Sequence, residues 1–268
     1  MVADGDSSRA PSRGPSDIAQ YFGRLAQSYG DGEYYIRRRA AVAAAIADEI
    51  AKARRILDLG CGNGRYLYEF RNSAPDALAI GADLTFEMLL EARGRNGIAT
   101  PLLRIDATAM PFRAGVLDVI FGSHIFQFIA DKDATMRDLA RCLVPGGAVI
   151  LTIGRSGIRE ALRPFMSDAQ WTRLANAAFP SRRALVAAEG EDPHRVAMER
   201  AGLAIEKRAA RFSVTWEGIV EWIFLRWGPF MDEEQRAAAS SALDEFAPQL
   251  SSRSFDLLEP MLLGRKLR

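Results

Sequence analysis

The sequence predicts an α/β fold in which helices cover both faces of one mainly parallel sheet. Between residues 53 and 154, short runs rich in Ile, Leu and Val alternate with segments whose apolar residues recur at helical spacing. These runs are apolar almost throughout, as expected for strands that are buried on both sides. A glycine-rich turn follows the first run, at 60–64, and opens a helix, which is the βα turn of such a fold.

Two helices are expected before the first strand. Apolar residues at helical spacing predict one over residues 17–29, which Gly30-Asp31-Gly32 ends, and an alanine-rich stretch predicts another over 33–51. Residues 1–16 are rich in Ser, Gly, Pro, Asp and Arg, and this composition predicts a flexible tail. The two helices, within 17–52, are expected to form a cap beside the core.

The core alternates strands with helices. Its five strands are predicted at Arg55–Leu59, Leu78–Ala82, Leu102–Ile105, Val116–Phe121 and Ala148–Ile153. Its helices are predicted at Arg65–Asn72, Thr85–Arg93 and Asp131–Cys142, the last of them stopped by Pro145-Gly146-Gly147.

The pattern loosens after residue 153. We expect a helix over 193–201, a strand over 204–214, helices over 216–227 and 233–246, and a last strand over 255–263. The segments 155–192 and 215–252 are interpreted as helical insertions on the substrate side. Without repeats or a clear linker, residues 17–268 are predicted to form one domain.

The composition argues against several classes of function. Lys plus Arg total 35 and Asp plus Glu 34, so net charge gives no field that would attract nucleic acid or an anionic membrane. The densest basic run, Arg37-Arg38-Arg39, is interpreted as a solvated helix face. Two cysteines and two histidines make neither a disulfide framework nor a zinc pattern, so no metal is expected. The absence of an apolar leader or an ~18-residue apolar span predicts a cytoplasmic protein.

The strongest signal is Asp58-Leu-Gly60-Cys-Gly62-Asn-Gly64. Glycines there allow a ligand to approach the backbone closely and allow positive φ in the turn. The dinucleotide fingerprint Gly-x-Gly-x-x-Gly would place its third glycine at position 65, where Arg65 stands, so a pyrophosphate cradle is disfavoured. The second strand leads to Asp83, and a carboxylate at that strand end suits the two hydroxyls of a ribose.

These motifs resemble the class I methyltransferases. Ile56–Gly64 is similar to their motif I, Gly81–Leu89 to their second strand and following helix, and Asp106–Phe112 to their adenine-contacting acidic motif. Val116–Ile120 and Leu143–Gly147 resemble the fourth- and fifth-strand motifs. The similarity is greatest to the subgroup that holds ubiquinone and menaquinone methyltransferases, methyltransferase type 11. It implies a Rossmann-like, mainly parallel, seven-stranded sheet with helical insertions after strands five and six.

The resemblance implies S-adenosyl-L-methionine (SAM) as cofactor and assigns contacts to it. Asp58 would help to hold the loop or the methionine ammonium, Asp83 would bind the ribose, and Asp106 would accept from the adenine amino group. The other cofactor positions that it implies are Gly60, Cys61, Gly62, Gly64, Leu84, Ala107 and Ser123.

Catalytic and substrate-side residues are expected at the carboxyl ends of the strands. His124 follows the fourth strand, and its imidazole is the candidate general base, with a pocket-shaping role as the alternative. The other histidine, His194, begins a late helix and is expected to face solvent. The substrate-side candidates are Tyr21, Tyr29, Gln127 and Trp222. Late aromatic residues are interpreted either as core or as one wall of an apolar pocket.

The function predicted is methyl transfer from SAM to a small apolar or aromatic metabolite, as in natural-product biosynthesis, by a monomer or homodimer. The accepting atom stays open among carbon, nitrogen and oxygen. One alternative keeps the SAM site but catalyses a non-methylating reaction such as cyclisation. An alternative of another class is an NAD(P)-dependent oxidoreductase, which Arg65 disfavours.

Overall fold

The computed structural model describes residues 14–96, 100–153, 157–178 and 192–267, and seven strands in them form one sheet. The strand order is β3-β2-β1-β4-β5-β7-β6. The strands are β1 Arg55–Leu59, β2 Leu78–Asp83, β3 Leu102–Arg104, β4 Leu117–Ser123, β5 Leu143–Thr152, β6 Leu203–Thr215 and β7 Ser254–Lys266. β1 to β5 pair in parallel, whereas β7 is antiparallel to both β5 and β6. The predicted Rossmann-like fold is therefore confirmed.

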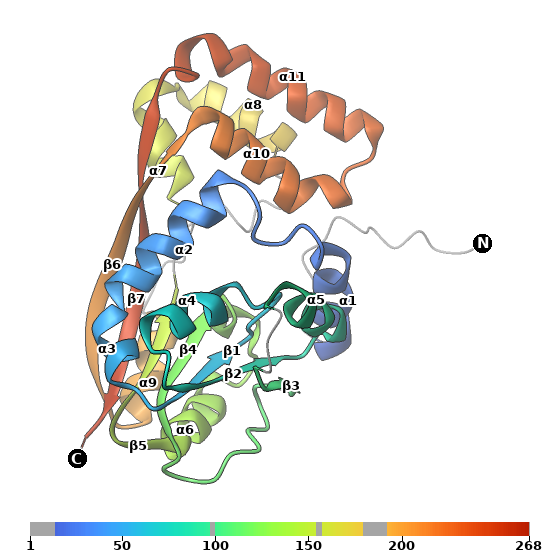
Figure 1. Cartoon of the computed structure of the whole chain (residues 1–268). Coiled ribbons are helices and arrows are strands. Elements are labelled where there is room, and N and C mark those ends of the chain that lie inside the picture. The colour runs from blue at the N-terminus through green and yellow to red at the C-terminus, as the bar shows by residue number, and fades with distance from the viewer. Residues whose placement is uncertain (1–13, 97–99, 154–156, 179–191, 268) are drawn as a thin grey trace.

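Helices cover both faces of this sheet (Figure 1). Those before and within the parallel half are α1 Pro15–Leu25, α2 Glu33–Ala45, α3 Ala47–Lys52, α4 Arg65–Ser73, α5 Phe86–Asn96 and α6 Lys132–Cys142. Those that follow β5 are α7 Ile158–Leu162, α8 Asp168–Ala178, α9 Pro193–Arg200, α10 Trp216–Trp227 and α11 Glu233–Leu250. Short 3-10 turns stand at η1 Phe126–Phe128, η2 Arg163–Phe165 and η4 Gly228–Phe230.

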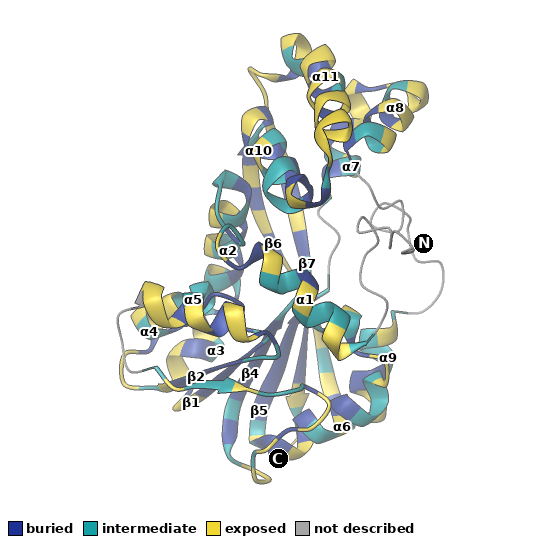
Figure 2. Cartoon of the chain, turned by 90° about the vertical axis from the view of Figure 1, so that its right-hand side faces the viewer, coloured by how far each residue is buried: buried dark blue, intermediate teal, exposed yellow. Residues whose placement is uncertain are grey.

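Alternate residues of the strands bury toward opposite faces. Leu57 and Ile120 pack in one cluster with α6 and α9, whereas Ile56 and Phe121 pack in another with α2, α3 and α4. At the edge of this half β3 is intermediate or exposed and β2 is buried only in part, but β1, β4 and the second half of β5 are buried almost throughout (Figure 2). Burial on both faces explains why their sequences are apolar runs rather than alternating patterns.

The helical insertions form a second core. Buried side chains of α7, α8, α10 and α11 pack on the end of β6 around Phe212 and on the start of β7 around Phe255. Tyr34 of α2 joins them. β6 and β7 pair over thirteen residues each, so this ribbon extends from the sheet into the insertions (Figure 1). The predicted insertions after strands five and six are thus present, although residues 179–191 lie outside the described ones.

Several predicted boundaries are wrong. The first helix ends at Leu25, short of Tyr29, and the helix expected over 33–51 is two helices separated at Ile46, which has φ −118° and ψ 9°. β5 begins at Leu143, five residues early, because Leu143 pairs with Leu117 before a register shift that accommodates the Pro-Gly-Gly turn. Of the expected tail 1–16, residues 1–13 lie outside the described residues, and the end of the tail is also wrong because Pro15 and Ser16 begin α1.

No helix in the described ranges is long and apolar enough to cross a membrane.

Candidate functional site

The glycine loop joins β1 to α4 through three left-handed residues. Gly60, Gly62 and Gly64 have φ of 70°, 53° and 79°, a region that residues with a Cβ rarely adopt. The amides of Gly60 and Cys61 donate to the Ala82 carbonyl at 2.7 and 2.9 Å, which holds the loop against β2. A Cβ on Gly62 would enter the space between Met88 and Tyr29, so the missing side chain leaves room for a ligand.

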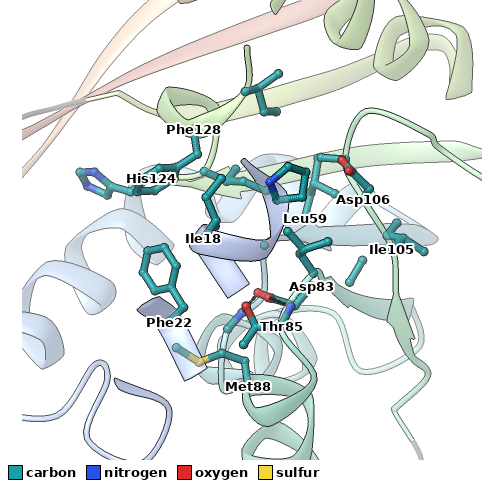
Figure 3. Close-up of a pocket in the computed structure, with 18 of the residues that line it drawn as sticks. Ile18, Phe22, Leu59, Asp83, Thr85, Met88, Ile105, Asp106, His124 and Phe128 are labelled. Atoms are coloured by element: carbon teal, nitrogen blue, oxygen red, sulfur yellow. Dashed lines mark hydrogen bonds between the residues drawn. The ribbon is translucent and has the colours of Figure 1, made fainter. Parts of the chain in front are cut away.

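A cavity of about 220 Å³ lies against this loop at the carboxyl ends of β1, β2 and β4. The sequence-predicted residues that line it are Gly60, Gly62, Asp83, Leu84, Asp106, Ala107, Ser123, His124 and Tyr29. Apolar side chains of α1 and of the segment after β4 complete the wall: Ile18, Phe22, Ile125, Phe128 and Ile129. Figure 3 shows Asp83 and Asp106 on one side of this cavity and His124 and Phe22 on the other.

Asp83 ties the loop to the end of β2. Its Oδ2 accepts from the Gly62 amide at 2.8 Å, and its Oδ1 accepts from the Thr85 amide at 2.8 Å. Burial raises the pKa of Asp83 even though these hydrogen bonds act to lower it. The carboxylate thus shapes the loop and also presents an acceptor to the cavity, which is what a ribose diol requires.

Asp106 stabilises its own turn and also lines the cavity. Its Oδ1 accepts from the amide of Thr108 at 2.9 Å and from the Thr108 hydroxyl at 2.8 Å. Among the described residues, none donates to its Oδ2. That oxygen is available to an amino group in the cavity, next to Ala107.

Asp58 lies beneath the loop and does not line the cavity. It is 1% exposed, and its Oδ2 has no hydrogen-bond partner in the described structure. Burial, with a smaller contribution from Asp83, raises the pKa of Asp58. A buried oxygen without a donor is costly, and a cationic or donor group of a ligand at the loop would satisfy it.

His124 has a strained backbone and a fixed ring. Its φ of 53° is the one positive value for a non-glycine residue in the described ranges, and its amide donates to Thr152 Oγ1 at 3.1 Å. Its Nε2 lies 2.8 Å from Oε1 of Glu259, which is fully buried on β7. Burial lowers the pKa of His124 more than Glu259 raises it.

Arg38 of α2 completes this network. Its Nε donates to Glu259 Oε2 at 2.7 Å, and its Nη2 donates to Ser123 Oγ at 2.9 Å and to Thr152 Oγ1 at 3.3 Å. Burial alone would raise the pKa of Glu259, but Arg38 and His124 together lower it to about 2. Glu259 is therefore an anion: its Oε2 accepts from Arg38, and its Oε1 lies 2.8 Å from the imidazole Nε2 without a well-formed hydrogen bond.

The interpretation of Arg37-Arg38-Arg39 as a solvated face is wrong at its middle residue, because Arg38 is 7% exposed and ion-paired. Sequence reasoning also missed Glu259. The available signal was a single acid inside the apolar strand Leu257-Leu-Glu-Pro-Met261. It missed Asn63 too, whose Nδ2 donates to the carbonyls of Ala26 and Tyr29 at 3.2 and 2.6 Å and so holds the end of α1 at the loop.

The four substrate-side candidates do not lie together at one site. Tyr29 lines the cavity, but Tyr21 stacks on Phe230 with ring centroids 4.6 Å apart, and Trp222 packs on Tyr34 at 5.0 Å. Gln127 is exposed on η1 and lines no part of the cavity. Cys61 and Gly64, expected at the cofactor, also lie off its lining.

His194 does not face solvent as expected. Its side chain is 14% exposed, its Nδ1 lies 2.8 Å from Asp192 Oδ1, and its ring lies 5.9 Å from that of Phe126. Among the described residues, no group of three or more His, Cys, Asp or Glu side chains is placed to hold a metal ion.

The strand order, the antiparallel β7 and the glycine loop beside an acidic strand end define a Rossmann-like fold of the class I methyltransferase type. Residues 57–151, about a third of the chain, match the family model described as a methyltransferase domain.

Two curated relatives share this region. A malonyl-[acyl-carrier protein] O-methyltransferase of Legionella pneumophila is 36% identical over 124 residues, which are 45% of this chain and 44% of the relative. A demethylmenaquinone methyltransferase of Thermus thermophilus is 32% identical over 139 residues, 51% of this chain and 62% of the relative. The chain thus aligns with about half the length of these relatives.

Among solved structures, the [4+2]-cyclase SpnF aligns over 96% of this chain and 97% of its own, with a TM-score of 0.58 and 16% identity. At that identity, the similarity concerns the fold alone.

Proposed function

We propose that this chain is a SAM-dependent methyltransferase that acts on a small, largely apolar metabolite. The observation that carries the proposal is the single cavity that joins the glycine loop, Asp83 and Asp106 to the His124 network. Methyl transfer needs a nucleoside-binding end and an acceptor end in one enclosed space. The family of residues 57–151 supports the same chemistry.

The residues present fit SAM. Gly62 leaves space between Met88 and Tyr29 beside the loop backbone, and Asp58 Oδ2 is a buried oxygen that lacks a donor among the described residues. We assign the ribose hydroxyls to Asp83, the adenine amino group to Asp106 with Ala107 beside it, and the methionine end to the loop above Asp58. When bound, SAM supplies an activated methyl group on a sulfonium sulfur.

At the acceptor end, we propose His124 as the general base. Because Glu259 is ionised and lies 2.8 Å from Nε2, the imidazole proton belongs on Nε2 and the lone pair on Nδ1. The lowered pKa keeps the ring neutral near pH 7, so Nδ1 can accept a proton from a phenol, enol or amine. The walls formed by Ile18, Phe22 and Phe128 exclude water and suit an apolar acceptor.

Binding tests the first half of this proposal. Calorimetry should show SAM and S-adenosylhomocysteine binding and no NAD binding. Arg65, at the slot of the third dinucleotide glycine, donates through Nε to the Tyr29 carbonyl at 3.3 Å and pairs with Asp31. Tight NAD binding without SAM binding would overturn the assignment.

Turnover tests the second half. We expect methyl-labelled SAM and a metabolite extract to yield label in a small product, in the presence of excess chelator. A requirement for added magnesium would contradict the metal-free mechanism. SAM binding with conversion of an extract compound but no label transfer would instead favour a non-methylating reaction such as cyclisation.

Three further properties are part of the proposal: a cytoplasmic protein, a role in natural-product biosynthesis, and a monomer or homodimer that needs no nucleic acid or membrane.

A further inference from the structure

Arg226 on α10 is a cation without an acidic partner. Its guanidinium lies 5.0 Å from the ring centroid of Tyr21 and 4.7 Å from that of Trp227, and it donates to the Tyr21 hydroxyl. No carboxylate among the described residues forms an ion pair with it. By contrast, Glu259 neutralises Arg38, an arginine near the cavity that is buried.

The neighbouring phenols cannot supply the missing charge. Burial raises the pKa of Tyr21, although Arg226 acts to lower it. The pKa of Tyr35, whose ring lies 5.6 Å from that of Tyr29, is also raised by burial. These phenols therefore stay neutral near pH 7, so the hydroxyl that Arg226 contacts is not an anion.

Aromatic contacts do not offset the burial of this charge. Taking a guanidinium out of water costs several kcal/mol, whereas a cation–π contact is worth about 0.5–2 kcal/mol. A partly buried arginine held only by rings and a neutral hydroxyl thus keeps unused donors and an uncompensated charge. An anion from outside the chain would satisfy both.

The charge lies next to the acceptor end of the cavity and behind residues that line it: neither Arg226 nor Tyr21 is part of the lining, but the Tyr21 ring lies 5.1 Å from that of Phe22. Tyr21 precedes Phe22, which lines the cavity on the same side as His124 (Figure 3). The positive charge of Arg226 contributes to the lowered pKa of His124 and interacts with Tyr29, both of which line the cavity. The nucleoside end holds two acidic side chains, Asp83 and Asp106, so the two ends differ in charge.

We propose that Arg226, with the Tyr21 hydroxyl, binds an oxyanion of the acceptor molecule, so that the substrate is an apolar body with a carboxylate or phosphate group. This inference rests on the proposed function and narrows its substrate class. Arg226 here selects the substrate and does not take part in the methyl transfer. A guanidinium presents paired donors to either oxyanion.

The test separates a metabolite extract of the source cells on an anion exchanger. The retained and unretained fractions are each incubated with methyl-labelled SAM and wild-type protein. We expect labelled product from the retained, anionic fraction, and phosphatase treatment of that fraction distinguishes phosphate from carboxylate acceptors. Label only from the unretained fraction overturns the inference and leaves the proposed function intact. If SAM binds but neither fraction yields labelled product, both the inference and the proposed function fail.

Variants then assign the effect to Arg226. With the anionic acceptor, Arg226→Gln should lower kcat/KM about tenfold or more, mainly through KM, because a hydrogen-bonded charge pair is lost. Arg226→Lys should recover part of that loss. The matched control is Arg253→Gln, which removes an arginine lying 4.5 Å over the Phe165 ring in the insertions, and it should change nothing.

Binding of S-adenosylhomocysteine by calorimetry, unchanged in all three variants, shows that the fold is retained. An Arg226→Gln enzyme with wild-type KM for an anionic acceptor overturns the inference.

Discussion

At the scale of single residues, Asp83 both supports the glycine loop and lines the cavity. Both of its oxygens accept backbone amides, from Gly62 and Thr85, while the carboxylate also lines the cavity. A carboxylate can accept up to four hydrogen bonds, so a ribose can share it with the loop.

Asp83→Ala should therefore weaken SAM binding by about 1.5–3 kcal/mol, the range for hydrogen bonds to a charged group. Calorimetry measures it, and circular dichroism checks the fold. Asp256→Asn is the control, because Asp256 accepts from Ser213 Oγ on the exposed side of β7. Unchanged SAM affinity in Asp83→Ala would show that this carboxylate is not the ribose ligand.

A second prediction about a single residue concerns the role of His124 as a general base. His124→Ala should lower kcat by about 10²–10⁴-fold at saturating substrate, with SAM affinity nearly unchanged, if a proton leaves the acceptor near the transition state. Since its pKa is lowered, wild-type kcat should stay flat from pH 7 to 8 and fall only below about pH 6.5. A variant that retains more than about a tenth of wild-type kcat rejects the general base.

At the scale of elements, the site depends on an ion pair between α2 and β7. β7 lies antiparallel beside β5, and the Ile153 amide donates to the Pro260 carbonyl at 3.0 Å, which brings Glu259 close to Thr152 and His124. Arg38 reaches the same carboxylate from the cap. Arg38 and Glu259 are 221 residues apart in sequence, and together they form the surroundings of the His124 imidazole.

A double-mutant cycle tests this coupling. Glu259→Leu alone should destabilise the protein by about 3–5 kcal/mol, because Arg38 then stays buried without a partner. Arg38→Met/Glu259→Leu should recover much of that stability, since a buried pair exchanged for apolar groups is often neutral. Urea unfolding at pH 7 gives the free energies. Arg38→Met is the second single variant of the cycle, and losses in the two single variants that add up to the loss in the double variant would show that the pair is not coupled.

At the scale of the whole molecule, the same pair makes stability depend on acid. The pKa of Glu259 is about 2 in the folded protein and about 4.5 in its ordinary range, so the unfolded chain binds the proton more readily between these values. Its contribution is complete above about pH 4.5 and is lost as the pH falls toward 2.

That difference corresponds to about 3 kcal/mol. Urea unfolding of the wild type between pH 5 and 2.5 should show a steeper loss than unfolding of Arg38→Met/Glu259→Leu, which lacks the titrating carboxylate. Identical slopes would mean that Glu259 does not have a lowered pKa.

The sequence by itself determined the parallel half of the fold and the residues of the glycine loop and acidic strand ends that line one end of the cavity. Both follow from local rules: apolar runs make buried strands, and the positive φ of Gly60, Gly62 and Gly64 requires glycine. Asp83 was found because it ends the second predicted strand, and Asp106 because its segment resembles the acidic motif of the class I methyltransferases.

Only the tertiary structure decided the acceptor end. Arg38, Glu259 and Arg226 lie on three elements that are distant in sequence, and each in isolation matches a solvated helix face or an ordinary strand residue. Their roles come from burial and pairing, which depend on how β7 enters the sheet and how α1, α2 and α10 pack around the cavity. Desolvation turns these ordinary side chains into an ion pair and an unpaired cation, and no local pattern encodes it.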